Sequence, residues 1–212
     1  MVDNPILEAV LENVEAVVDT LTTNELVREI PVVGTAVKLL KGAQNIRDRL
    51  FAAKLLRFIE KLESVSPETR ERIRQKITNN SDEARKVGET ALLVVERITA
   101  PEKADLIAIL FLAYIDDQID VTEFRRLCVV IDQAFLDDLM ELLSRREAPT
   151  KSKEPFMENL SATGLVKPVP GNTIGELGEL FYGATKLARK LRHAHEHGRR
   201  LLNNGRRESH GS

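Results

Sequence analysis

Residues 106–111 read Leu-Ile-Ala-Ile-Leu-Phe and would form a helix that is apolar on nearly every side. A helix without a polar face is stable in water only when other parts of the protein cover it all round, which places it in the middle of a bundle. Apolar residues recur at helical spacing through most of the first 146 residues, without the alternation typical of strands. The sequence therefore predicts an all-α fold, a multi-helix bundle.

Several residues mark where the helices around this segment begin. Ser66 followed by Pro67 predicts one helix start, because serine caps a helix and proline fits its first turn. Ser81 begins another helix. Asp120, with Glu123 three residues later, has the residue chemistry of a capping box. These signals predict a series of helices joined by short turns.

Two of the expected helices have a recognisable apolar face. One helix is predicted from Val32 onward, and its apolar face consists of Leu39, Ile46, Leu50, Leu55, Ile59 and Leu62. The other follows the capping box, and its buried face consists of Phe124, Leu127, Ile131 and Phe135. We expect one core to contain Leu110, Phe111, Leu127, Cys128 and Ile131. Because Cys128 is the only cysteine, no intramolecular disulfide is possible.

The composition limits the classes of function. The chain has 212 residues, of which 42% are hydrophobic, enough for one large or two small domains with real cores. Aromatic residues make up only 4% and tryptophan is absent, which argues against a base-stacking platform or a carbohydrate cleft. No apolar run approaches the roughly 18–20 residues that span a bilayer, and acidic residues interrupt the N-terminus. We therefore expect a soluble, cytoplasmic protein.

The charge is distributed unevenly along the chain. Residues 183–212 contain eight Lys or Arg and two Glu, a net charge of +6, which leaves −8 for the rest because the whole chain carries −2. A polar stretch with two prolines at 147–155 is the best candidate boundary. The sequence thus predicts a helical bundle over 1–146, a linker over 147–155, a small module over 156–198 and a basic tail over 199–212.

The stretch from Phe156 to Tyr182 suggests what the small module is. An amphipathic helix runs into Thr163, a β-favouring segment follows, and a tight turn is expected at 170–172. A second helix is then expected to start at Thr173 and to continue through Leu187 and Leu191 toward Leu201 and Leu202, with Gly198 as a point where it could fray. This order of helix, small hairpin at about 165–174 and helix resembles the end of a winged-helix domain.

A wider resemblance covers most of the chain. Residues 31–36, Pro-Val-Val-Gly-Thr-Ala, together with 46–51, Ile-Arg-Asp-Arg-Leu-Phe, and the C-terminal hairpin resemble a set of uncharacterised bacterial all-helical proteins. The shared motifs are structural and imply no particular activity.

The sequence offers little that would hold a metal or perform catalysis. Residues 111–124 resemble part of an EF-hand, or the helix-turn-helix of tellurite-resistance B-type helical domains, but Leu112 and Tyr114 occupy the first and third ligand positions. His193 and His197 share one helical face, yet no third ligand is identifiable. Phosphate-loop, nucleophile-elbow and zinc-protease motifs are missing. We expect no metal, no cofactor, no small-molecule substrate and no enzyme activity.

Nucleic acid is a second kind of partner to consider. If the module binds DNA, the basic tail would attract phosphates and the segment 151–172 would orient the protein. The candidate contacts are Lys151, Lys153, Asn159, Lys167, Arg199, Arg200, Arg206 and Arg207. Glu154 and Glu158 lie among them, so the surface expected to read the groove is not strongly basic.

Three hypotheses of function remain open. The leading one is a non-enzymatic bacterial binding or regulatory protein that acts through protein–protein contacts. The second is a DNA-binding winged-helix regulator. The third is a membrane-associated accessory factor of a toxin or phage-defence operon, acting through the apolar and charged residues of 30–51. We favour burial of 30–51 in the bundle and do not expect membrane binding.

Overall fold

The fold is mostly helical, with one two-stranded hairpin near the C-terminus, and this confirms the expected fold class. The structure is a computed structural model that describes residues 45–171, 173–176 and 178–209, with side chains as far as Gly205. It also describes the isolated positions Ala16, Asp19, Thr20, Thr23, Ile30 and Gly34. Apart from Gly34, residues 32–44, with which the helix predicted from Val32 begins, lie outside the described residues.

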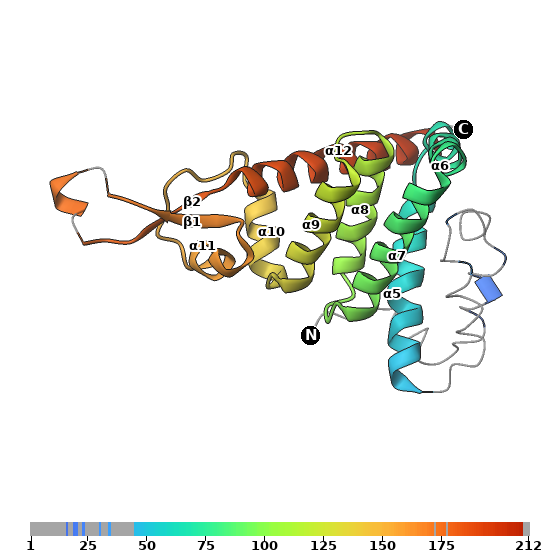
Figure 1. Cartoon of the computed structure of the whole chain (residues 1–212), viewed down its shortest axis with the longest axis horizontal. Coiled ribbons are helices and arrows are strands. Elements are labelled where there is room, and N and C mark those ends of the chain that lie inside the picture. Colours follow the sequence, from blue (N-terminus) through green and yellow to red (C-terminus); the bar gives the residue numbers. More distant parts are fainter. Residues whose placement is uncertain are drawn as a thin grey trace.

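The described helices and strands follow one another with short connections (Figure 1). The bundle consists of α5 (Ile46–Glu63), α6 (Pro67–Asn79), α7 (Ser81–Arg97), α8 (Lys103–Ile115), α9 (Val121–Gln133) and α10 (Leu136–Ser144). The rest consists of α11 (Pro155–Asn159), the 3-10 helix η1 (Leu160–Thr163), β1 (Val166–Val169), the 3-10 turn η2 (Ile174–Glu176), β2 (Phe181–Ala184) and α12 (Lys186–Ser209).

Helix α8 is the centre of the bundle, as its all-round apolar sequence predicts. Every residue from Lys103 to Ile115 is buried except Asp105, which lies partly exposed and pairs with Arg57 of α5 at 2.8 Å. Helices α5, α9 and α12 cover it, so that the last helix of the chain packs against the middle one (Figure 1). Burial of α8 therefore requires residues from both ends of the described chain.

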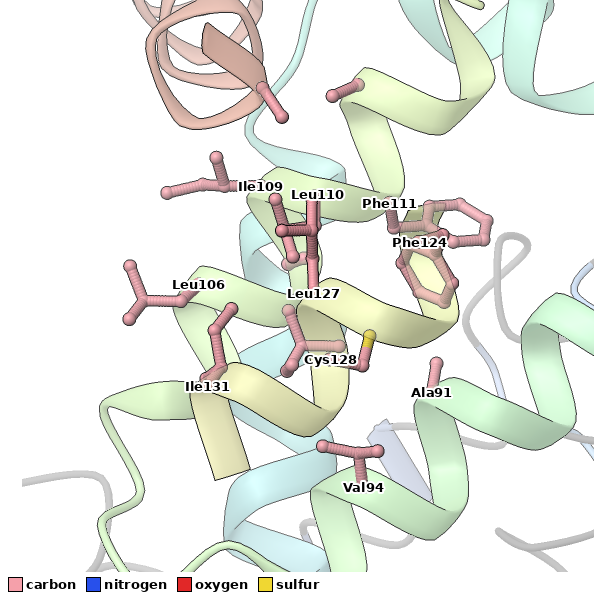
Figure 2. Close-up of a cluster of buried hydrophobic side chains, with 14 of the residues drawn as sticks. Ala91, Val94, Leu106, Ile109, Leu110, Phe111, Phe124, Leu127, Cys128 and Ile131 are labelled. Atoms are coloured by element: carbon pink, nitrogen blue, oxygen red, sulfur yellow. The ribbon is translucent and has the colours of Figure 1, made fainter. Parts of the chain in front are cut away.

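The predicted core between α8 and α9 is confirmed. Leu110, Phe111, Leu127, Cys128 and Ile131 are all buried in one cluster, with the α9 side chains pointing toward α8 (Figure 2). The Phe111 ring makes edge contacts with Phe58 at 6.0 Å and with Phe124 at 6.4 Å between centroids. Cys128 is a core residue, and burial raises the pKa of its thiol. A raised pKa keeps the thiol protonated and therefore unreactive.

The predicted helix caps are confirmed as well. The Ser66 hydroxyl accepts a hydrogen bond from the Thr69 N–H at 3.3 Å, and Pro67 occupies the first turn of α6. Asp120 accepts from the Glu123 N–H at 2.8 Å, and Glu123 accepts from the Asp120 N–H at 3.1 Å. Each cap satisfies N–H groups that a helix leaves without a partner in its first turn.

Some residues expected in the core lie on the surface. Phe135 is 64% exposed, because α9 ends at Gln133 and Phe135 lies in the connection that caps α10. Ile46 is 71% exposed and Leu50 is also exposed, because Asn45 caps α5 and the first turns of that helix extend beyond the core. The buried face of α5 begins with Ala52 and continues to Leu62.

The hairpin is present, but its second strand comes later in the chain than predicted. β1 pairs antiparallel with β2, with Val166 opposite Ala184 and Val169 opposite Phe181. The predicted tight turn at 170–172 is wrong, because residues 170–180 join the two strands; Asn172 itself lies outside the described residues. The helix predicted from Thr173 is also wrong, since only the short η2 forms there.

Two constraints explain why β2 is a strand and not the start of a helix. Gly178 has φ of +85°, a left-handed conformation that ends helical winding and that glycine adopts without steric cost. Tyr182 exchanges two 2.8 Å backbone hydrogen bonds with Ser152, on the edge of β2 away from β1. In the hairpin Tyr182 lies opposite Pro168, which has no backbone N–H. Because Tyr182 already bonds with Ser152, the register places the proline where no N–H donor is needed.

The expected fraying at Gly198 is wrong, and the part of the basic tail up to residue 209 continues α12. α12 continues to Ser209, and Leu201 and Leu202 are buried. Gly198 lies so close to the Ile109 backbone of α8 that a Cβ there would overlap the carbonyl oxygen. The glycine is needed for the close approach of the two helices, and their packing stabilises α12 through this point.

We expect Phe111→Ala to lower the free energy of unfolding by roughly 3–5 kcal/mol, because the ring fills the centre of the core. Urea denaturation followed by circular dichroism measures this change. Leu93→Ala is the control, since Leu93 is 62% exposed on α7 and its truncation should change stability by about 0.5 kcal/mol or less. Equal effects of the two substitutions would contradict the placement of α8.

We expect Gly198→Ala to destabilise the protein even though alanine favours a helix by about 1 kcal/mol over glycine. The added methyl group would push against backbone and not against a flexible side chain, and overpacking of this kind costs about 1–3 kcal/mol. Asn203→Ala, on the exposed side of the same helix, should leave the melting temperature unchanged or raise it. A higher melting temperature for Gly198→Ala would show that α12 does not pack closely on α8.

Candidate functional site

The best candidate site is a groove along α9, next to the segment that leads into the hairpin. It measures about 460 Å³, within the range of pockets that bury small ligands or side chains. We call it the α9 groove, and it is lined by Thr122, Arg125, Arg126, Val129, Val130, Gln133, Thr163 and Leu187. Six of these residues come from α9, one from η1 and one from α12.

The α9 groove combines an apolar floor with two cationic groups. Val129 is 45% exposed although it is aliphatic, and Leu187 is half-buried on the opposite wall. Arg125 and Arg126 are exposed, and their guanidinium groups make no ion pair or hydrogen bond with any residue that the structure describes. The groove therefore offers apolar surface beside donors that can hold a carboxylate in a two-point contact.

Hydrogen bonds hold the walls of the groove in place. The Thr163 hydroxyl donates to the Leu160 carbonyl at 2.7 Å, which ties down η1. The Thr185 hydroxyl donates to the Gly164 carbonyl at 2.8 Å and so fixes the start of α12 beside η1. Lys190 pairs with Glu123 at 3.0 Å and joins α12 to α9. The groove is thus a feature of the folded protein, formed from segments that are joined to one another.

The hairpin forms an arm that extends away from the helices (Figure 1). At the far end of its two strands, where β2 begins, the ammonium groups of Lys151 and Lys153 lie 4.1 and 4.8 Å from the centre of the Phe181 ring. Lys151 pairs with Glu176 at 2.5 Å, and Lys153 pairs with Glu179. We define the hairpin tip as Ile174, Glu176, Glu179 and Leu180. Ile174 is 87% exposed and Leu180 is 55% exposed, so the arm carries apolar side chains far from the core.

A second pocket lies at the start of α5 and carries less chemistry for a ligand. It measures about 350 Å³, but its charged groups already have partners. Arg47 pairs with Glu96 at 2.6 Å, and Lys54 donates to the carbonyls of Glu96 at 2.5 Å and of Ile98 at 3.0 Å. These contacts close the end of α7, so the polar groups of this pocket act within the fold.

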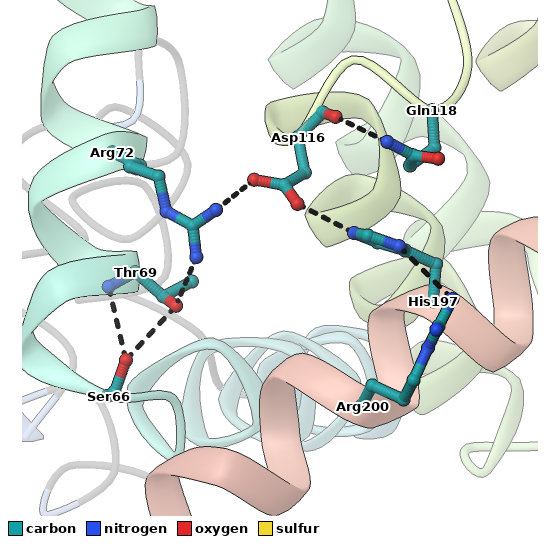
Figure 3. Close-up of polar contacts among 7 residues, drawn as sticks. All are labelled: Ser66, Thr69, Arg72, Asp116, Gln118, His197 and Arg200. Carbon is teal, nitrogen blue, oxygen red and sulfur yellow. Dashed lines mark hydrogen bonds and ion pairs between the residues drawn. The ribbon is translucent and has the colours of Figure 1, made fainter.

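The two histidines that share a helical face contact the turn between α8 and α9, and Figure 3 shows the contact of His197. His197 Nε2 lies 2.7 Å from one carboxylate oxygen of Asp116, whose other oxygen accepts from Arg72 of α6. His193 Nε2 lies 3.2 Å from Gln118 Oε1. These contacts join α6, the α8–α9 turn and α12, which is a structural role at the end of the bundle.

No group of three or more His, Cys, Asp or Glu side chains in the described part of the chain is arranged to hold a metal ion. The EF-hand-like segment places Leu112 and Tyr114 inside the core, and Asp120 and Glu123 form the helix cap. None of the helices within the described ranges is long and apolar enough to cross a membrane.

The structure does not gather on one surface the six candidate nucleic-acid contacts whose side chains it describes. Lys151 and Lys153 lie together beside the start of β2 and are paired there with Glu176 and Glu179. Asn159 and Lys167 are exposed on α11 and β1. Arg199 and Arg200 are exposed on α12, more than 12 residues, or about 20 Å, beyond its start. Arg206 and Arg207 belong to the same helix, and their side chains lie outside the described residues.

The residues of the α9 groove were not among the sequence candidates. The sequence marked α9 only by its buried face, and the groove depends on contacts with η1 and α12 that are distant in sequence. One local signal was present, since Arg125 has no acidic residue three or four positions away that could pair with it on the helix. An arginine without such a partner, next to an exposed valine, was the available indication of a binding surface.

Comparisons with protein-family models, with curated proteins and with solved structures found no match to this chain. The function must therefore be inferred from the chemistry of its surfaces.

His195 of α12 is buried, with 5% of its surface exposed. Burial, together with the nearby charges of Arg199 and Arg192, lowers its pKa to about 4. The unfolded chain therefore takes up a proton as the pH falls below about 6.5 while the folded protein does not, so stability decreases from pH 6.5 to pH 4. The full decrease from this residue is at most about 3 kcal/mol.

We expect His195→Gln to remove that part of the acid sensitivity. Urea denaturation at several pH values should give a free energy of unfolding that falls less between pH 6.5 and pH 4 in the variant than in the wild type. All other titrating groups are common to both proteins, so the difference between the two curves isolates His195. Parallel curves would show that this histidine is accessible to protons in the folded state.

Proposed function

We propose that this protein is a non-enzymatic binding protein that acts through protein–protein contacts, and that the α9 groove holds a segment of its partner. The observation that carries the proposal is the pair Arg125 and Arg126, which have no described acidic partner and border exposed apolar surface. Arginine beside aliphatic or aromatic surface is typical of the residues that contribute most to binding at protein interfaces.

The lining of the groove fits binding better than catalysis. Its side chains are threonine, arginine, valine, glutamine and leucine, which provide hydrogen-bond donors and apolar surface. The lining contains no histidine, carboxylate or cysteine that could act as an acid, a base or a strong nucleophile. The partner segment that matches it carries one or two carboxylates next to aliphatic side chains, so that arginine meets carboxylate and Val129 is covered.

DNA binding stays an alternative, and α12 is the observation that favours it. Lys186, Arg199 and Arg200 lie exposed along this helix, which is about 36 Å long by its 24 residues. Deleting residues 199–212 would not test it cleanly, because Leu201 and Leu202 are buried in the fold. Replacing Lys186, Arg199 and Arg200 with glutamine removes the charge and leaves the packing intact. A lower affinity for mixed duplex DNA, with a shallower salt dependence, would favour this alternative.

Site-specific photo-crosslinking in the native host tests the groove. A photoreactive amino acid at position 129 should form a defined adduct with one partner protein, whether another copy of this chain or a different protein, because Val129 lies on the exposed floor of the groove. The same amino acid at position 93 is the matched control, because Leu93 is also an aliphatic residue exposed on a helix, α7. Arg125→Glu with Arg126→Glu should reduce the adduct at position 129 by roughly tenfold or more, since losing a desolvated charge pair costs about 2–5 kcal/mol.

Two outcomes would contradict the proposal. The first is the same set of adducts from positions 129 and 93, which would mean random collision. The second is an adduct at position 129 that the two charge reversals leave unchanged, which would mean that the arginines do not take part in binding.

A further inference from the structure

We propose that the segment held in the α9 groove is the hairpin tip of a second copy of this chain, an inference that rests on the function proposed above. In this arrangement Ile174 and Leu180 of one molecule cover the apolar floor around Val129 and Leu187 of the next. The carboxylates of Glu176 and Glu179 then meet the guanidinium groups of Arg125 and Arg126.

The hairpin tip has the chemistry that the groove requires. Ile174 and Leu180 are two of the large apolar side chains that the described part of the chain leaves exposed. Glu176 and Glu179 both lie between these two residues in the sequence, so aliphatic and acidic side chains stand close together within seven residues. Gly175 and Gly178 have open space where a side chain would be, which makes the tip slender enough to enter a groove.

The lysines that already pair with the tip do not prevent a second contact. Glu179 pairs with Lys153, but its side chain is still 43% exposed, and Glu176 is 27% exposed beside Lys151. A carboxylate has about four sites that accept hydrogen bonds, so it can receive an arginine while keeping its lysine. The exposed pair of Lys153 with Glu179 contributes little to stability, so its rearrangement opposes binding only weakly, while Glu176 keeps its less exposed contact with Lys151.

The tip cannot fill the groove of its own chain. Figure 1 shows η2 at the far end of the arm, separated from α9 and α12 by the full length of the hairpin. The groove lies at the root of the arm, where Thr163 and Leu187 flank the two strands. A contact between tip and groove therefore joins two molecules.

This contact joins the tip of one molecule to the groove of another, so every pair still has one free tip and one free groove. A molecule whose tip is bound still has an open groove, and a molecule whose groove is filled still has an open tip. Contacts of this head-to-tail kind produce closed rings or open chains, according to the rotation between neighbours. The protein is therefore expected to assemble progressively as its concentration rises.

Mixing two full-length variants tests the inference. Ile174→Ser with Leu180→Ser removes the apolar side chains of the tip and leaves the groove intact. Arg125→Glu with Arg126→Glu reverses the charges of the groove and leaves the tip intact. All four positions are exposed, and circular dichroism melting curves should confirm that both variants fold as the wild type does. Analytical ultracentrifugation gives the mass of each sample over a range of concentrations.

We expect the wild type to increase in mass with concentration and each variant alone to remain a monomer. The two variants mixed in equal amounts should form a dimer that grows no further, because one intact tip and one intact groove are present per pair. A wild type that stays monomeric at every concentration would overturn the inference, as would an associating wild type whose two variants do not combine. In either case an adduct from position 129 with a different protein would leave the proposed function standing.

Discussion

The burial of α8 on all sides is the constraint on which the rest of the structure depends. A helix with apolar residues all round cannot be covered by its neighbours in sequence alone, and α5 and α9 leave one side open. Helix α12, from the end of the chain, closes that side. Gly198 is required at this contact because the two backbones approach too closely for a side chain. The core therefore determines where the C-terminal helix lies.

The position of α12 then determines where the functional surfaces lie. Its first turn is fixed to η1 through Thr185, and one wall of the α9 groove is formed by Leu187. Further along, the buried Arg192 donates to the carbonyls of Leu142 and Arg145, which otherwise lack partners at the end of α10. The helix that follows the arm thus packs directly against α8 in the core.

Local patterns predicted the parts of the fold that depend on local chemistry. The all-apolar run of α8 and the cap of Asp120 with Glu123 could be read directly, since each depends on neighbouring residues. The position of β2 could not, because it depends on the pairing of Tyr182 with Ser152, thirty residues away. The fraying expected at Gly198 was wrong, since only the packed structure shows that Ile109 excludes a side chain there. The α9 groove was missed for the same reason, as its walls meet only in three dimensions.

Hydrogen exchange of backbone amides, measured at increasing denaturant, tests most directly whether α8 depends on α12. We expect the amides of α8 and those of α12 around Gly198 to exchange only through global unfolding. Both sets should then share one free energy of opening and one dependence on denaturant. If α12 opened at a lower free energy while α8 remained protected, α8 would be covered without it. That result would contradict the central role of the contact between these two helices.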